Sequence, residues 1–362
     1  AGKTHTYSLT ITFLNKDENQ DDNQGVSFST KVSINETKEA SSSNASSAAS
    51  TIKALAATDT VNFATDDPDN NIRYIGANPN NYVYFNCSDY NNQSDSTCEK
   101  WRIIGVFKNM TKSDGIKEDL VKIIRDDSIG YYSWDSSDSS INSGWGVNDW
   151  TNADVMKLLN SGYDSETVGG SLYWNAKSGT CYKANENYTT SCDFTSTGLK
   201  NDLTRNAIES VVWNLGGTEV YESASNDWYG YERGTTVYSG RPITWTGKVG
   251  LMYPSDYGYA TAGGVTTNRA ACLAKKLVFW DGSGVSDCKN NDYLFKSYNQ
   301  WTLAPNSSIS YAVFRVRADG SVNGNSADSS NGVLPVAFLK SNILISEVGN
   351  GSSESPFQLK VG

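Results

Sequence analysis

The chain has 362 residues, of which 38% are hydrophobic and 12% aromatic, so it can bury the core of one large domain or of two ordinary ones. Acidic residues outnumber basic residues by 40 to 30, which gives a formal net charge of -10. This charge disfavours nucleic acids and anionic membrane surfaces as partners, and no apolar run reaches the length of about 18 residues that a membrane span needs. With only 19% charged residues, the surface must be rich in Asn, Ser, Thr, Gly and Tyr, which is typical of secreted and cell-surface proteins.

The N-terminal segment, residues 1–38, has the pattern of a β-strand or hairpin. Large apolar and small hydroxylated side chains alternate in its first part, which predicts a half-buried strand. The apolar face of this strand consists of Tyr7, Leu9, Ile11 and Phe13. A second alternating run follows, so the two runs could pair as a hairpin. The start at Ala1, without an initiator Met, indicates a mature form from which a signal peptide has been removed.

Residues 39–65 are rich in Ser and Ala and contain few large side chains, which is typical of a flexible linker. We therefore place the main domain at residues 66–362. Its most apolar runs, 101–107 and 120–124, are hydrophobic on both faces and predict strands in the middle of a sheet. Shorter strands are expected elsewhere, and Pro335 within the last of them indicates a sheet edge or a bulge.

Three helices are expected in the main domain. The first has its N-cap at Thr151 and ends before Gly162. A second apolar stripe covers residues 199–215, and a third helix runs from 267 to 278. Residues 221–245 are aromatic and Gly-rich without a clear period, which predicts a long irregular segment. Together these elements predict an α+β fold with an antiparallel sheet, three helices and long irregular aromatic loops.

The six cysteines form three couples that are close in sequence, and this spacing favours local disulfide bonds over the other pairings. Each bond would close a loop and contribute roughly 3 kcal/mol in the chain-entropy model. Buried free thiols are the alternative. Oxidised cysteines would place the protein outside the cell. The predicted bonds are Cys87–Cys98, Cys181–Cys192 and Cys272–Cys288.

Few residues in the sequence offer catalytic or metal-binding chemistry. The only histidine, His5, lies in the N-terminal segment, and neither a CxxC pair nor a Cys/His cluster is present. An acidic run at residues 17–22 resembles a calcium loop but lacks its glycine and its closing Glu. No nucleotide-binding glycine motif occurs either. We therefore predict no catalytic residue, no metal and no cofactor.

Aromatic residues in polar loops are the strongest candidates for ligand contact. Such side chains, flanked by Asp and Asn, can stack on sugar rings or bind another protein. They can equally form the core of a loop, in which case they bury its turns. The candidates for a ligand surface are Trp145, Trp150, Trp228, Tyr229 and Tyr231.

Several motifs resemble an uncharacterised family of exported bacterial proteins that share the domain of unknown function 6273. The motifs are NPNNYV (78–83), WRIIGV (101–106), IGYYSWD (129–135), GSLYWN (170–175) and GKVGLMYPSDYG (247–258). The resemblance covers roughly residues 72–345 and implies no known activity. It also suggests, by fold analogy, the C-type-lectin-like fold that formylglycine-generating enzymes share. Where that family has an Arg before the proline of its last strand, this chain has Leu334.

Three functions follow as hypotheses. The first is a non-enzymatic subunit of an extracellular filament or surface layer, assembled when the N-terminal strand of one copy completes a sheet of the next. The second is a lectin-like adhesin that binds a glycan or a host protein through its aromatic loops. A glycoside hydrolase comes third, because no spacing singles out a pair of carboxylates.

Overall fold

The computed structural model describes residues 46–136, 144–161, 170–184, 189–281, 287–289 and 291–361. The chain divides into two units, Ala1–Ser43 and Asn44–Gly362, and every described residue belongs to the second. The predicted N-terminal strand, His5 and the acidic run at 17–22 therefore lie outside the described residues. Within the described residues the fold is rich in strands with a few short helices, so the predicted α+β class is confirmed.

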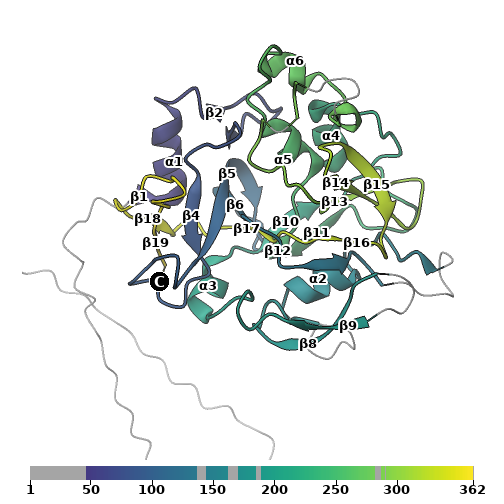
Figure 1. Cartoon of the computed structure of the whole chain (residues 1–362), viewed down its shortest axis with the longest axis horizontal. Helices are drawn as coiled ribbons and strands as arrows, with labels where there is room; N and C mark the ends of the chain where they lie inside the picture. The colour runs from purple at the N-terminus through teal and green to yellow at the C-terminus, as the bar shows by residue number, and fades with distance from the viewer. Residues whose placement is uncertain are drawn as a thin grey trace, which may run out of the picture. The chain divides into compact units, whose positions relative to one another are not determined.

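A seven-stranded antiparallel sheet forms the centre of the domain (Figure 1). Its strands follow the order β12-β17-β6-β5-β3-β2, and β4 also pairs with β5. The apolar residues at 101–107 and 120–124 are at most 2% exposed, which confirms their predicted place in the middle of a sheet. The strands are β2 (Phe63–Ala64), β3 (Ile72–Tyr74), β4 (Tyr82–Phe85), β5 (Glu99–Thr111), β6 (Lys117–Arg125), β12 (Val249–Gly250) and β17 (Val336–Phe338).

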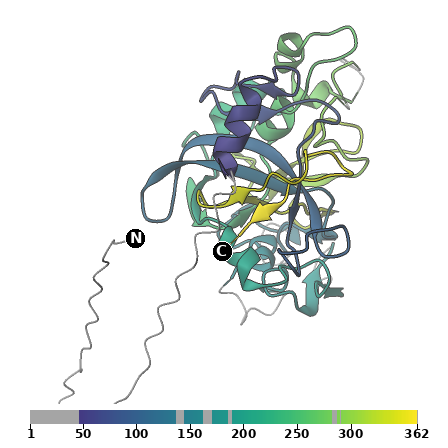
Figure 2. The same cartoon turned by 90° about the vertical axis from the view of Figure 1, so that its left-hand side faces the viewer.

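The last apolar run closes this sheet, because β17 lies between β12 and β6. Pro335 precedes β17 and its carbonyl accepts a hydrogen bond from the Arg125 N–H at 3.0 Å. The prediction of an edge or a bulge at this proline is wrong, because a proline just before a strand removes no hydrogen bond from the ladder. The next two strands in the order, β6 and β5, form a long hairpin whose end extends beyond the rest of the domain (Figure 2).

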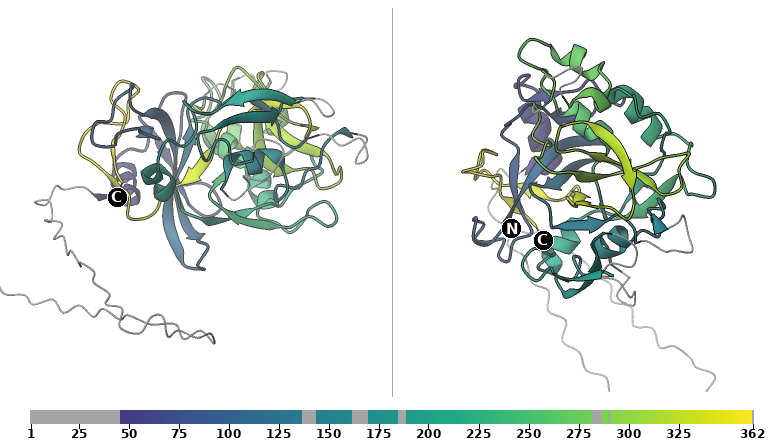
Figure 3. Two further views of the ribbon diagram at one scale, coloured as in Figure 1. Left: turned by 90° about the horizontal axis from the view of Figure 1, so that it is seen from below. Right: turned by 45° about the vertical axis from the view of Figure 1, so that its right-hand side comes forward.

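A second sheet of five strands has the order β15-β14-β13-β16-β7, in which only β13 and β16 pair in parallel. Its outer strand β15 lies at the opposite end of the domain from the first helix, α1 (Ala48–Ala56) (Figures 1 and 3). Its strands are β7 (Tyr131–Ser133), β13 (Gln300–Pro305), β14 (Ala312–Val316), β15 (Val322–Ser326) and β16 (Ser330–Gly332).

Smaller sheets complete the strand content of the described residues. In the first, β1 (Ser46–Ser47) pairs with β18 (Leu344–Ile345), which pairs in turn with β19 (Leu359–Lys360). The other two are pairs of antiparallel strands. Their strands are β8 (Ser178–Tyr182) with β9 (Thr189–Asp193), and β10 (Val211–Asn214) with β11 (Thr244–Gly247).

The helices differ in part from the prediction. The first predicted helix is present as α2 (Asp154–Leu159), and the third is present in shortened form. The stripe at 199–215 is helical only in its first half and then forms β10, because β-branched and aromatic residues there pair with β11. Residues 221–245 are not wholly irregular, since they include a helix and the start of β11. The remaining helices are α3 (Asp202–Ala207), α4 (Ser225–Glu232), α5 (Pro254–Tyr259), α6 (Arg269–Leu273) and the 3-10 turn η3 (Leu277–Phe279).

The predicted linker at 39–65 is wrong for its second part. Residues 46–65 form β1, α1 and β2, and the α1 side chain of Ile52 is completely buried against the core. The Ser47 hydroxyl accepts a hydrogen bond from the Ser50 N–H at 3.2 Å and caps α1. The many Ala and Ser residues made this tract look too poor in large side chains to pack on a core. Small residues such as Ala48 nevertheless allow a helix to pack closely. The described domain thus begins about 20 residues before the predicted boundary at residue 66.

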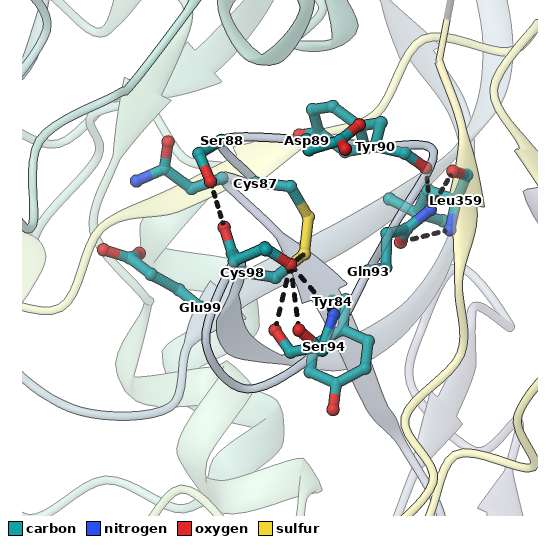
Figure 4. The surroundings of a disulfide bond; sticks show 12 residues. Tyr84, Cys87, Ser88, Asp89, Tyr90, Gln93, Ser94, Cys98, Glu99 and Leu359 are labelled. Atoms are coloured by element: carbon teal, nitrogen blue, oxygen red, sulfur yellow. Dashed lines mark hydrogen bonds between the residues drawn. A yellow bond between two sulfur atoms is a disulfide. The ribbon is translucent and has the colours of Figure 1, made fainter.

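All three predicted disulfide bonds are present, and no cysteine of the chain is free. Cys87 follows β4 and Cys98 precedes β5, so the first bond closes the loop between two paired strands (Figure 4). Gln93 within this loop binds β19 at two points (Figure 4): its amide nitrogen donates to the Leu359 carbonyl at 2.7 Å, and its amide oxygen accepts from the Leu359 N–H at 3.0 Å. The first bond therefore also supports the C-terminal strand.

Candidate ligand-binding pocket

A pocket of about 190 Å³ lies beside the β5–β6 hairpin, where β10, the end of α4 and the residue before α5 come together. Its walls combine aromatic rings with amide and charged side chains, which is the usual composition of a small-molecule site. The lining residues are Asp69, Asn71, Phe107, Lys108, Asn109, Met110, Thr111, Lys122, Val212, Trp213, Asn214, Tyr229, Arg233, Tyr253 and Phe338.

A β-bulge shapes one wall of this pocket. The register between β5 and β6 shifts between Phe107 and Met110, and Asn109 inside the shift has a φ of 53°. The bulge is held from both sides, because the Lys108 N–H donates to Asn71 at 2.7 Å and the Asn109 N–H donates to Asp119 at 3.0 Å. Bulges and left-handed non-glycine residues are enriched next to functional sites, which makes this wall a candidate contact surface.

Arg233 and Tyr229 form a stacked pair at the pocket. The guanidinium carbon of Arg233 lies 3.3 Å from the centre of the Tyr229 ring, and Nη1 donates to Glu232 at 3.2 Å. The Tyr229 hydroxyl in turn donates to Asp69 at 2.6 Å. Stacking on an aromatic face fixes the plane of a guanidinium, so its remaining N–H groups keep a defined direction.

A buried chain of ion pairs forms the floor. Lys122 of β6 is 1% exposed and donates to Asp256 of α5 at 2.5 Å. Asp256 also accepts from Arg73 of β3 at 2.9 Å, and Arg73 donates to Asp67 at 2.6 Å. The Lys122 ammonium is further surrounded by the rings of Phe107, Trp213, Tyr253 and Phe338, at 4.7 to 5.7 Å from their centres. Two cations and two carboxylates thus balance one another beneath the pocket.

The pKa values of this floor follow from its charges. Burial opposes the ionisation of Asp256, but the charges of Lys122 and Arg73 outweigh it and lower the pKa of Asp256 to about 2. Burial is the main cause that lowers the pKa of Lys122 to about 8. Repulsion by Arg73 and Arg233 also lowers it, and the attraction of Asp256 opposes both effects. Lys122 is therefore charged at neutral pH, with its charge compensated by Asp256 rather than available to a ligand.

Glu232 adds a third buried carboxyl behind the pocket. It is fully buried and accepts hydrogen bonds from the Ser255 N–H at 2.8 Å and from the Ser255 hydroxyl. Burial raises the pKa of Glu232 to about 7, against the effect of the Arg233 charge. At neutral pH this carboxyl is thus close to the point where it gains or loses a proton.

The five aromatic residues predicted as a ligand surface do not form one exposed surface. Trp150, Trp228 and Tyr229 are at most 3% exposed, because they pack in the core instead of covering the loops. Trp145 is 49% exposed and stacks near Tyr311, at 5.3 Å between ring centres. Tyr231 is half-buried, with its ring 6.4 Å from that of Trp228. Of the five candidates, only Tyr229 lines the pocket.

Leu334, which stands where the resembled family has an Arg, is 3% exposed and belongs to the hydrophobic core. The ion-pair floor was not predicted, although the sequence contains a signal for it. A lysine inside the apolar run at 120–124 implies a buried partner, because an unpaired charge is not tolerated in the middle of a sheet. Its partner Asp256 follows in the motif at 247–258, where the Tyr253 N–H donates to its carboxylate at 3.0 Å.

No group of three or more His, Cys, Asp or Glu side chains suited to a metal ion occurs among the described residues. None of the helices in the described ranges is both long and apolar enough to cross a membrane. Comparisons of the chain with models of known families, with curated proteins and with solved structures gave no match. The resemblance to the domain of unknown function 6273 and the analogy with C-type-lectin-like folds stay predictions.

Proposed function

We propose that the domain is an extracellular binding module whose pocket takes one small ligand with a carboxylate, such as the acidic sugar unit of a glycan. The observation that carries this proposal is the Arg233 guanidinium, held flat on Tyr229 beside an aromatic-walled pocket. An oriented guanidinium favours a carboxylate because the two groups can form parallel hydrogen bonds.

The charges around the pocket support an anionic ligand. Lys108, Lys122 and Arg233 are the cations of the lining, whereas Asp69 is its only carboxylate; Asp69 accepts from Tyr229 and lies 3.9 Å from the Arg233 Nε. Among the described residues Lys108 has no ion pair. The size of the pocket, about six water molecules in liquid volume, favours a single sugar ring or a molecule of similar size. An aromatic wall adds stacking on the apolar face of such a ring.

Three disulfide bonds support an extracellular location, since such bonds persist in oxidising compartments. A pocket of low affinity is sufficient on a surface that displays many copies, because avidity raises the overall affinity for a polymeric glycan. This version of the adhesin hypothesis keeps the expected ligand class and moves the contact from the aromatic loops to the pocket.

Calorimetric titration with hexuronates and with matching neutral hexoses tests the proposal. We expect binding of a hexuronate and at least tenfold weaker binding of its neutral analogue, since a hydrogen bond to a charged group contributes about 1.5–3 kcal/mol. Arg233→Met should weaken hexuronate binding by about 10- to 100-fold. Arg241→Met is the matched control, because Arg241 also lies near a tyrosine ring, at 5.6 Å from Tyr238, but outside the pocket. Equal binding of charged and neutral sugars, or an unaffected Arg233 variant, would overturn the proposal.

The filament hypothesis is a second proposal, which the alternating pattern at residues 4–14 favours. We propose that this segment adds as a strand to a sheet of a neighbouring copy, with Tyr7, Leu9, Ile11 and Phe13 as the anchoring side chains. Period-two alternation over a whole segment suits strand addition, because main-chain bonds supply strength while every second side chain fills a groove.

Electron microscopy and light scattering of a variant with these four residues changed to Ser test this second proposal. The variant should stay a folded monomer while the natural sequence forms polymers. Thr10→Ser together with Thr12→Ser is the control, because these residues would lie on the opposite face of the proposed strand and should not affect assembly. Polymers formed by the four-residue variant would eliminate this segment as the assembly strand.

A further inference from the structure

Arg102 of β5 is a buried cation that takes no part in the pocket. It pairs in register with Tyr82 of β4 and with Ile124 of β6, and it is 3% exposed. Two tyrosine rings lie near its guanidinium carbon, with their centres at 3.8 Å for Tyr82 and 5.1 Å for Tyr293. Arg102 therefore occupies the core of the central sheet and not its surface.

The Arg102 guanidinium interacts with the Tyr82 side chain, but two of its nitrogen atoms lack a hydrogen-bond partner. Nε and Nη2 are buried without a hydrogen bond, and the described residues give Arg102 no ion pair. Asp126 attracts its charge, but that carboxylate makes its ion pair with Lys296 at 3.3 Å. The other buried arginine of this sheet, Arg73, contacts two carboxylates. A guanidinium without a counterion in a core is strongly unfavourable unless another group neutralises it.

Neighbouring hydroxyl groups show the same deficit of acceptors. Tyr293, whose ring lies beside the Arg102 guanidinium, has a buried hydroxyl without a hydrogen-bond partner. The Tyr74 hydroxyl is also buried and unpaired, and Tyr293 is close enough to Tyr74 to raise its pKa. Several unpaired donors around one cation call for an acceptor with negative charge.

We propose that Arg102, together with the Tyr293 hydroxyl, binds a small inorganic anion of the size of chloride inside the domain. The cation supplies the charge, its Nε and Nη2 atoms supply two directed donors, and the hydroxyl supplies a third. A monatomic anion fits this place better than an organic acid, because Arg102 lines neither the ligand pocket nor any open groove described above. The anion would neutralise the cation and so stabilise the folded chain. This site is independent of the carboxylate pocket.

Thermal unfolding in sodium chloride and in sodium gluconate at equal ionic strength tests the proposal. The unfolding midpoint should rise with chloride by about 2 °C for each tenfold increase above the dissociation constant, and should not rise with gluconate. Arg102→Leu should abolish this dependence. Tyr293→Phe, which keeps the ring and removes the hydroxyl, should shift the dependence to higher chloride and serves if the first variant does not fold.

Arg125→Leu is the matched control, because Arg125 is paired with Glu99 at 3.1 Å. It should lower the midpoint and leave the chloride dependence intact. Crystals soaked in bromide should show an anomalous peak beside Arg102. A midpoint that is the same in chloride and gluconate, or ordered water in place of the bromide, overturns the proposal.

Discussion

Asp256 holds two buried cations, and its replacement by Asn should be among the most destabilising changes in the domain. The carboxylate contacts Lys122 at 2.5 Å and Arg73 at 2.9 Å, and the side chains of all three residues are at most 2% exposed. Asn has nearly the same shape but no charge, so it leaves Lys122 without a counterion and Arg73 with Asp67 alone. Breaking a buried ion pair by removing one partner costs about 3–5 kcal/mol. We expect Asp256→Asn to lower the free energy of unfolding by this amount.

Urea unfolding followed by tryptophan fluorescence and circular dichroism measures this loss. Asp95→Asn is the control, because Asp95 pairs with Lys100 on the surface and is 67% exposed, so its change should cost at most about 1 kcal/mol. Adding Lys122→Met to Asp256→Asn should recover part of the loss, since it removes the cation left unpaired. The reasoning is refuted if Asp256→Asn costs no more than the control, or if the added Lys122→Met makes the domain weaker still.

Three further predictions concern stability. Burial raises the pKa of Glu232 to about 7, so the folded chain keeps this proton at a pH where the unfolded chain has lost it. Stability should therefore fall as pH rises from about 4.5 to about 7. The urea midpoint of Glu232→Gln should decline less over this range than that of the natural protein, and an equal decline would contradict the assignment. Replacing Cys87 and Cys98 by Ser should lower the free energy of unfolding by roughly 3 kcal/mol, which differential scanning calorimetry can check against the oxidised natural protein. Ile52→Ala should cost about 2–5 kcal/mol, whereas Leu55→Ala on the exposed side of α1 should cost under about 0.5 kcal/mol; equal urea midpoints for the two variants would show that α1 does not belong to the core.

Local patterns predicted the parts of the fold that depend on neighbours in sequence. The runs at 101–107 and 120–124 could be assigned to the middle of a sheet because apolar residues on both faces leave no solvent side. The disulfide bonds were predictable because each couple brackets one short loop. The helix in the Ser/Ala tract was not predictable, because its burial depends on Ile52 and on a sheet surface formed by later residues.

The candidate pocket depends on contacts between distant segments, and no local pattern describes such contacts. Lys122 and Asp256 are separated by 134 positions, and Asn71 meets Tyr229 across 158. Each residue taken alone is consistent with a turn, a cap or an exposed strand position. The exposure of the aromatic residues was not predictable for a related reason. Trp228 lies in a polar stretch of sequence, yet it is buried and packs on Phe314 of β14 at 4.6 Å between ring centres. Tertiary packing decided whether these rings face solvent.

The pairing of β1 with β18 sets how the domain would respond to a pulling force. Tension that arrives through the chain before Ser46 meets only two strand-paired residues, Ser46 with Ile345 and Ser47 with Leu344, and then α1. The first disulfide bond on this path begins at Cys87. Before that bond, β2, β3 and β4 hold the chain in the central sheet, so β1 and α1 can unravel and extend by up to roughly 35–40 Å before this sheet takes the load. Under tension the domain would lengthen from its α1 side while the cross-linked remainder kept its shape.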